Sequence, residues 1–226
     1  MSFQCQYGDY VEPCSFMDKF IYPFFAGVDE SGIAVFIKSS PTIIPWAGSF
    51  HLLALGLIGG AIFMADARAL GAGPKSISTH SLYSRMKLFL LVAIAGLVLS
   101  GTVLALGEMM RLYESPPYWV KMWSLVAILV FTFTARRAVF ENEGKITKPA
   151  AIIGGIAILM WAIPFLIMSG IHARVAMILM WIGLGAAFWY SSKQDDAEPK
   201  NIRIAAMISI AMWLTTAVAG RWIAFY

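Results

Sequence analysis

The sequence contains few charged residues and very little cysteine. Of its 226 residues, 13% are charged and 59% are hydrophobic, whereas a typical soluble domain is about one quarter charged. This composition argues against a water-soluble fold. The excess of Lys and Arg does not indicate nucleic-acid binding, because the basic residues stand at the ends of apolar runs, where they commonly flank membrane spans.

Sequence signatures of nucleotide-binding proteins and hydrolases are also absent. The chain has no GxGxxG, P-loop or HExxH pattern, which would position phosphates or zinc. The segment after Met1 is polar and carries Asp9, Glu12 and Asp18, so it does not resemble a cleavable signal peptide. We therefore expect the first apolar span to remain in the protein.

The sequence has instead a series of long apolar runs. About 20 apolar residues in a helix cross a hydrocarbon core about 30 Å thick. The sequence therefore predicts an all-α integral membrane protein, a bundle of about six transmembrane helices with an N-terminal interfacial segment. We expect an extension over residues 1–45 and a transmembrane domain over residues 46–226. The expected spans are 46–65, 88–107, 118–135, 149–170, 172–192 and 204–224.

The basic residues predict the orientation of the chain. The loops that follow the first, third and fifth expected spans hold 11 of the 17 Lys and Arg residues. Because cytoplasmic loops are enriched in Lys and Arg, we expect these loops in the cytoplasm and both termini outside. An odd number of spans would place the termini on opposite sides.

Both cysteines of the chain, Cys5 and Cys14, lie in the N-terminal extension. On an oxidising outer face, two cysteines nine positions apart can close a small loop as a disulfide. The alternatives are two free thiols or a metal site. Residues 16–38 alternate aromatic clusters with acidic residues and glycine, which favours a segment lying along the outer membrane surface.

Histidines in the apolar spans are the first candidates for function, because ionisable residues at membrane depth are costly and are often functional. His51 lies near the start of the first expected span and His172 opens the fifth, so the topology places both near the outer face. Two imidazoles on different helices can ligate a b-type haem. Lys121 and Arg221 lie close enough to the same face to bind its propionates.

Two other interpretations of these histidines remain open. His51 can hydrogen-bond a backbone carbonyl or a hydroxyl across a helix contact, with His172 an ordinary interfacial residue and no cofactor bound. Copper is the second alternative, because thioether and imidazole groups suit Cu(I), although methionine is also a common packing residue. The methionines expected near the outer face are Met109, Met110 and Met168.

Asp66 and Arg68 stand where the first expected span meets the cytoplasm. They can pair with each other, or with Arg85 or Arg136. The simpler interpretation is a solvated cluster that fixes the depth of the span. Small residues predict close helix packing in the first and fourth spans, and the first pair of adjacent glycines can instead make room for a planar cofactor. These small residues are Gly56, Gly59, Gly60, Ala61, Gly154 and Gly155.

Four stretches together resemble a family of bacterial inner-membrane proteins that is known as a domain of unknown function. They are residues 51–71, residues 117–121, the amphipathic approach to the first span, and the chain end at 219–224, which is the most specific. The resemblance covers roughly two thirds of the chain and implies a bacterial inner membrane, with both termini periplasmic. Family members have about four spans, so the hairpin over residues 149–192 is expected to be an addition.

A histidine followed by a glycine-rich first span is also remotely similar to copper-resistance D proteins and b-type cytochromes. Our leading hypothesis is therefore a membrane subunit that binds haem b and transfers electrons. The alternatives are copper handling, small-solute transport, or a structural role in a larger membrane complex. The expected partners are the lipid bilayer and other membrane subunits or further copies of the chain, and no nucleic acid is expected.

Overall fold

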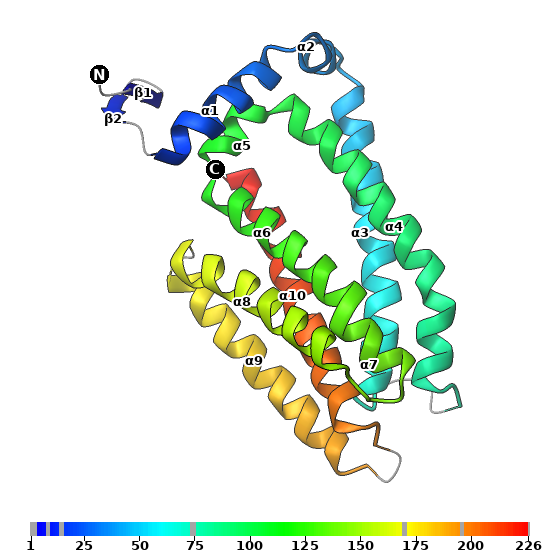
Figure 1. Ribbon diagram of the computed structural model, residues 1–226. Helices are drawn as coiled ribbons and strands as arrows, with labels where there is room; N and C mark the ends of the chain where they lie inside the picture. The colour runs from blue at the N-terminus through cyan, green and yellow to red at the C-terminus, as the bar shows by residue number, and fades with distance from the viewer. Residues whose placement is uncertain are drawn as a thin grey trace. The chain divides into compact units, whose positions relative to one another are not determined.

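The computed structural model describes residues 4–7, 10–13, 16–72, 76–168, 171–194 and 197–225. Side chains are described for residues 18–72, 76–167, 174–194 and 197–225. The chain is almost entirely helical (Figure 1). The exception in this part is a short antiparallel hairpin of β1 (Gln4–Tyr7) and β2 (Tyr10–Pro13), which pairs Cys5 with Glu12. Cys14 lies outside the described residues, so the disulfide with Cys5 remains a prediction.

Six helical segments are long and apolar enough to cross a membrane, which confirms the prediction of an all-α multi-pass membrane protein. Their bounds are Ile43–Ala69, Thr79–Gly107, Pro116–Glu141, Lys148–Ile167, Arg174–Ser192 and Lys200–Phe225. Several extend beyond the spans expected from the sequence. The second, for example, begins nine residues earlier, before Arg85 and Lys87. The bounds differ because an uncharged run marks only the part of a helix that crosses the hydrocarbon core. The helix itself continues into the polar residues on either side.

The long segments are built from the following elements, in chain order, and Figure 1 labels the α-helices among them. They are α3 (Ile43–Ala69), α4 (Thr79–Gly107), α6 (Pro116–Phe131), η1 (Thr132–Arg136), α7 (Arg137–Glu141), α8 (Lys148–Met168), α9 (Ile171–Ser192) and α10 (Lys200–Trp222). A short 3₁₀ turn, η2 (Ile223–Phe225), follows α10. The chain folds into two compact units, the first formed by residues 1–52 and 96–115 and the second by residues 53–95 and 116–226. Helices α3 and α4 contribute residues to both.

The first unit contains three shorter helices, α1 (Phe16–Asp29), α2 (Gly32–Ser39) and α5 (Met109–Glu114). Helix α1 packs against α5, and the Tyr113 hydroxyl donates a hydrogen bond to Asp18. Helices α1 and α2 meet at 55°, and together they could form one broken span, which would make seven. Helix α1 is amphipathic, because Phe20 and Phe24 are exposed whereas Phe25 is buried.

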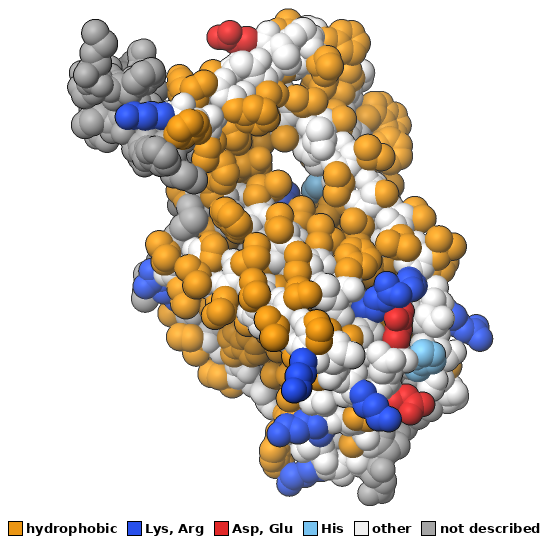
Figure 2. Space-filling view, in the orientation of Figure 1, with side chains coloured by type: hydrophobic (Ala, Val, Ile, Leu, Met, Phe, Trp, Pro, Cys, Tyr) orange, Lys and Arg blue, Asp and Glu red, His pale blue; other side chains and the backbone are white. Residues whose placement is uncertain are grey.

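The second unit is organised around α10. In its most apolar stretch, α10 has 67% of its residues buried, whereas α9 has 6%. Helix α10 therefore forms the interior of the unit, and α9 faces the lipid. Helix α6 packs against both α8 and α10. Hydrophobic side chains cover the visible surface over α8 and α9, while Lys and Arg gather where α7 ends and α10 begins (Figure 2). We call this the basic end of the second unit; it comprises residues 136–148 and 193–203.

Close helix packing at glycine is found at one of the positions that the sequence suggested. A Cβ atom on Gly154 of α8 would overlap the Cβ of Ala135, so only glycine lets these helices approach so closely. The prediction is wrong for the other glycines, because a Cβ there would meet no atom within 4 Å. These are Gly56, Gly59, Gly60 and Gly155.

Candidate functional site

The most deeply buried charges in the described part of the chain form one ion pair in the second unit. Asp66 lies near the end of α3, and Arg136 is the last residue of η1. The Nε and Nη2 atoms of Arg136 donate hydrogen bonds to Oδ1 of Asp66 at 3.1 and 2.7 Å. The two side chains are 1% and 0% exposed. This arrangement selects one of the three pairings of Asp66 that the sequence left open.

The interpretation of Asp66 and Arg68 as a solvated cluster is therefore wrong. Asp66 shares the buried face of α3 with Ile62, Ala65 and Ala69, so the helix directs its carboxylate into the bundle. Arg68 points elsewhere, and its Nε donates a hydrogen bond to the Ile77 carbonyl at 3.1 Å.

Two aromatic rings enclose the guanidinium of Arg136. Its Cζ atom lies 4.5 Å from the centroid of the Phe140 ring and 5.2 Å from that of Tyr83. Both distances fit cation–π contacts, which gain strength where water is excluded. The pair is thus shielded by Tyr83 of α4 and Phe140 of α7.

The backbone around Arg136 departs from a regular α-helix. Residues Thr132–Arg136 form a π-helical turn, η1, between α6 and α7. Such turns are rare and often occur at functional sites, because they reorient side chains within a helix. Here Thr132, Ala135 and Arg136 are all buried. The π turn therefore belongs to the structure that presents Arg136 to Asp66.

The ion pair continues into a series of buried polar atoms. Within the described part of the chain, these atoms lack a hydrogen-bond partner of good geometry, although the Ser209 hydroxyl interacts with the Asp66 carboxylate. They lie on α3, α6, η1 and α10. Buried polar groups are usually paired, so a cluster of exceptions calls for waters or a bound solute. The residues, which we call the polar line, are Asp66, Arg136, Thr132, Ser209, Trp213 and Ser124.

Most residues of the polar line lie on two helical segments. Ser124, Thr132 and Arg136 lie on the α6–η1 segment. Ser209 and Trp213 are four residues apart on α10, which packs against both α6 and η1. Apart from Asp66 on α3, the polar line therefore belongs to helices that pack together.

Lys121 lies where the same two helices meet at the other end of α6. A Cβ atom on Gly220 would lie 3.3 Å from Cε and 3.4 Å from Nζ of Lys121, so the lysine side chain runs beside the end of α10. Arg221 is exposed, and its guanidinium lies 4.9 Å from the ring of Phe225. The structure thus brings Lys121 next to Gly220, while Arg221 turns toward the chain end.

His51 belongs to the first unit, where it contacts α4. Its Nδ1 atom lies 3.0 Å from the Ser100 hydroxyl, which itself donates a hydrogen bond to the Gly96 carbonyl at 2.6 Å. Because the Ser100 hydroxyl already donates to Gly96, it is placed to accept a hydrogen bond from the Nδ1–H of His51. A Cβ on Gly101 would lie 3.1 Å from Cε1 of His51. The bond from His51 to a hydroxyl across a helix contact, which the first alternative expected, is therefore present.

The four residues suggested for haem are divided between the two units. His51 lies in the first, whereas Lys121, Arg221 and His172 lie in the second. The side chain of His172 falls outside the described part, so its role as a ligand remains a prediction. Among the described residues, no group of three or more His, Cys, Asp or Glu side chains could hold a metal ion.

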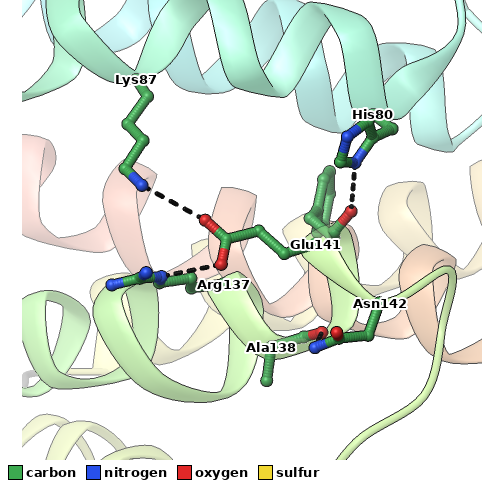
Figure 3. A network of polar contacts seen from close by, with 7 residues as sticks. His80, Lys87, Arg137, Ala138, Glu141 and Asn142 are labelled. Atoms are coloured by element: carbon green, nitrogen blue, oxygen red, sulfur yellow. Dashed lines mark hydrogen bonds and ion pairs between the residues drawn. The ribbon is translucent and has the colours of Figure 1, made fainter.

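A polar network at the basic end joins the start of α4 to α7 (Figure 3). Glu141 accepts hydrogen bonds from Lys87 at 3.2 Å and from Arg137 at 2.9 Å. The Nδ1 atom of His80 lies 3.1 Å from the Phe140 carbonyl oxygen. These contacts hold Phe140 in the position where its ring covers Arg136.

A model of a family of unknown function, DUF6644, matches residues 25–187 of the chain. The protein belongs to the DUF6644 family. The match includes His51, Asp66, Lys121 and Arg136, so both the histidine contact and the ion pair lie within the family domain. No curated protein and no solved structure matches the chain at a significant level.

The DUF6644 match also changes two expectations drawn from the resemblance. It runs through α8 and most of α9, so the hairpin over residues 149–192 is part of the family domain up to residue 187. The expectation that this hairpin is an addition is wrong. The chain end at 219–224, taken as the most specific stretch, lies beyond the match.

Proposed function

We propose that this DUF6644 protein is a membrane transport protein that carries protons, with the Asp66 carboxylate, held by Arg136, as the group that accepts and releases them. The observation that carries the proposal is the burial of this pair, at 0% and 1% exposure, within membrane-spanning helices. Charges in such a place are costly and commonly mark proton or ion pathways. A purely structural contact between these helices could be apolar at no loss of stability.

The polar line supports the same proposal. It adds donors and acceptors beside the pair, namely the hydroxyls of Thr132, Ser209 and Ser124 and the indole of Trp213. Protons move to and from a buried carboxylate through chains of hydroxyls and waters. Helices α6 and α10 and the η1 turn, which pack together, supply hydroxyls for such a chain.

Proton flux into liposomes tests this function. The purified protein is reconstituted with a pH-sensitive dye inside, and a potassium gradient with valinomycin drives proton entry. We expect entry to be faster than in protein-free liposomes. We expect the increase to be lost in the double variant Asp66→Leu/Arg136→Leu, which removes both charges together. The control Lys38→Leu removes an exposed charge of the first unit, which pairs with Asp29, and should leave the flux unchanged.

Two results would contradict the proposal. Wild-type protein that is no faster than protein-free liposomes would remove the transport function for protons. A double variant that keeps the wild-type rate would show that the ion pair is not part of the pathway.

Haem binding at His51 is a second candidate, supported by the hydrogen bond from His51 to Ser100. Ligating histidines commonly donate their other ring N–H to a fixed acceptor, which sets the tautomer. The contact from His51 to Ser100 is one of this kind.

Difference spectra test the haem candidate. Protein produced with haem available is purified, and dithionite-reduced minus oxidised spectra are recorded for the wild type and for His51→Ala. The hypothesis expects a Soret band that is lost in the variant. A wild-type protein without this band would end the hypothesis, and a His51→Ala variant with the full band would remove His51 from it.

A further inference from the structure

The second unit contains an apolar pocket at its basic end that the ion pair does not use. The pocket has a volume of about 180 Å³ and is lined by α6 with η1 and α7, by α8 and by α10. Its lining is apolar except for Asn201, and its walls include Phe131, Ile158 and Ile208. We propose that this pocket binds an acyl chain of an anionic phospholipid, with the headgroup held by Lys145, Lys148 and Lys200.

The dimensions of the pocket suit an extended hydrocarbon chain. On α8 the lining runs from Ala151 to Ile158, and on α10 it runs from Asn201 to Ile208. At 1.5 Å per residue, each wall is about 10 Å long. The two walls thus form an elongated apolar pocket parallel to the spans, which is the direction of lipid tails in a bilayer.

The charges at the mouth favour an anionic headgroup. We call the end of the pocket that Ile146 and Asn201 line its mouth. In the sequence, Lys145 and Lys148 flank Ile146, and Lys200 precedes Asn201. All three lysines are exposed. Basic clusters between membrane helices are typical binding sites for anionic lipid headgroups.

The backbone fixes these lysines at the mouth. The Asn201 side chain donates a hydrogen bond to the Gly144 carbonyl at 2.9 Å, which ties the turn before Lys145 to the start of α10. Gly144 has a φ of +88°, and a Cβ there would lie 2.8 Å from Cβ of Pro199. Only glycine fits this position without strain, so the turn stays close to α10.

The close packing at Gly154 explains why a lipid, and not a side chain of the same protein, fills the pocket. Gly154 lines the pocket where α8 approaches Ala135, so the wall cannot be filled from that position without separating the helices. The pocket is open at the surface of a helical unit whose exposed side chains are largely apolar (Figure 2). Lipid is the solvent that contacts such a surface.

Thermal unfolding of the full chain in detergent tests the site. Purified protein is mixed with phosphatidylglycerol or with phosphatidylcholine of the same acyl composition, and unfolding is followed by tryptophan fluorescence. We expect phosphatidylglycerol to raise Tm by about 5 °C more than phosphatidylcholine, as a ligand bound well above its Kd would. We also expect one phosphatidylglycerol molecule to remain bound in native mass spectra.

Two pairs of variants test the site. The first pair distinguishes the lysines at the mouth from a general effect of charge, and the second distinguishes the pocket from a neighbouring surface position. Lys145→Gln/Lys148→Gln/Lys200→Gln should lose the extra shift, whereas Lys19→Gln/Arg85→Gln/Lys193→Gln, which removes the same charge from other exposed positions, should keep it. Ala151→Trp fills the pocket and should lose the shift. Ile152→Trp, on an exposed neighbouring position outside the lining, should keep it.

Several outcomes would overturn the proposal. Equal shifts with both lipids would exclude recognition of the headgroup, and equal losses in both triple variants would indicate a general charge effect. Full retention of the shift in Ala151→Trp would place the lipid elsewhere. If a variant does not fold, the wild-type mass spectrum decides, because absence of a one-to-one adduct also overturns the site.

Discussion

The exposed ion pairs of the first unit and the buried ion pair of the second unit place their charges in different surroundings. In the first unit, Lys38 pairs with Asp29 at 2.6 Å and Arg111 with Glu108 at 2.9 Å, and all four side chains are between 24% and 47% exposed. In the second unit, Asp66 and Arg136 are paired at a similar distance but are shielded from solvent.

The difference shows that distance alone does not give the energy of an ion pair. Water screens the exposed pairs and competes for their hydrogen bonds, so each contributes little to stability. The buried pair cannot be resolvated when one partner is removed, so each charge depends on the other. Removing one charge therefore changes stability little in an exposed pair and strongly in the buried pair.

Topology gives the largest expected effect, because reporter activity is either present or absent. We expect alkaline phosphatase fused to either terminus to be active, which places both termini outside. The reason is the excess of Lys and Arg in the loops at the basic end. Activity at only one terminus would show seven spans, with α1 and α2 forming the extra span, and would move the first unit's exposed pairs into the membrane.

The next largest effect is expected for single removal of a buried charge. Arg136→Leu leaves Asp66 charged and unpaired in the bundle, and we expect a loss of about 3–5 kcal/mol in the free energy of unfolding. The double variant Asp66→Leu/Arg136→Leu should regain most of it. Denaturant unfolding in detergent measures both. A single variant as stable as wild type would show that the pair is not isolated from water.

A smaller effect is expected at the contact between His51 and Ser100. Ser100→Ala leaves the His51 Nδ1–H without its acceptor, and an unsatisfied buried donor costs about 1–3 kcal/mol. Thr102→Ala is the matched control, because the Thr102 hydroxyl is exposed and bonds only the Val98 carbonyl of its own helix. Equal stability of the two variants in thermal unfolding would refute the assigned hydrogen bond.

The smallest effect is expected for the exposed pairs of the first unit. Lys38→Gln should change the free energy of unfolding by less than about 1 kcal/mol, and the change should decrease further in high salt. Unfolding at low and high ionic strength measures this. A loss as large as that of Arg136→Leu would contradict the comparison, because it would mean that Lys38 is effectively buried.

Much of the fold could be predicted from the sequence, because membrane spans depend on local composition. Runs without charge must avoid water, and a helix is the way to satisfy their backbone within lipid. The spans, the amphipathic segment before them and the candidate His51 all follow from this local rule. The short hairpin near the N-terminus and the π turn at Thr132–Arg136 were not predicted, since neither has a local pattern that distinguishes it.

The candidate site depended more strongly on tertiary structure. Asp66 and Arg136 are 70 residues apart, and the sequence left three possible pairings of Asp66 and favoured solvation. The sequence carries no periodic signal for the polar line. It could not show that α10 packs against α6 and so buries Ser124, Ser209 and Trp213.

The sequence by itself determined that the chain lies in a membrane, where its helices begin and end to within several residues, and which loops are basic. These properties depend on the chemistry of contiguous residues and their solvent. Only the tertiary structure decided that Asp66 pairs with Arg136, that Ser100 orients His51, and that an apolar pocket opens beside Lys145. Those facts depend on which helix faces cover one another, and burial by a distant segment turns an ordinary charge into a functional candidate.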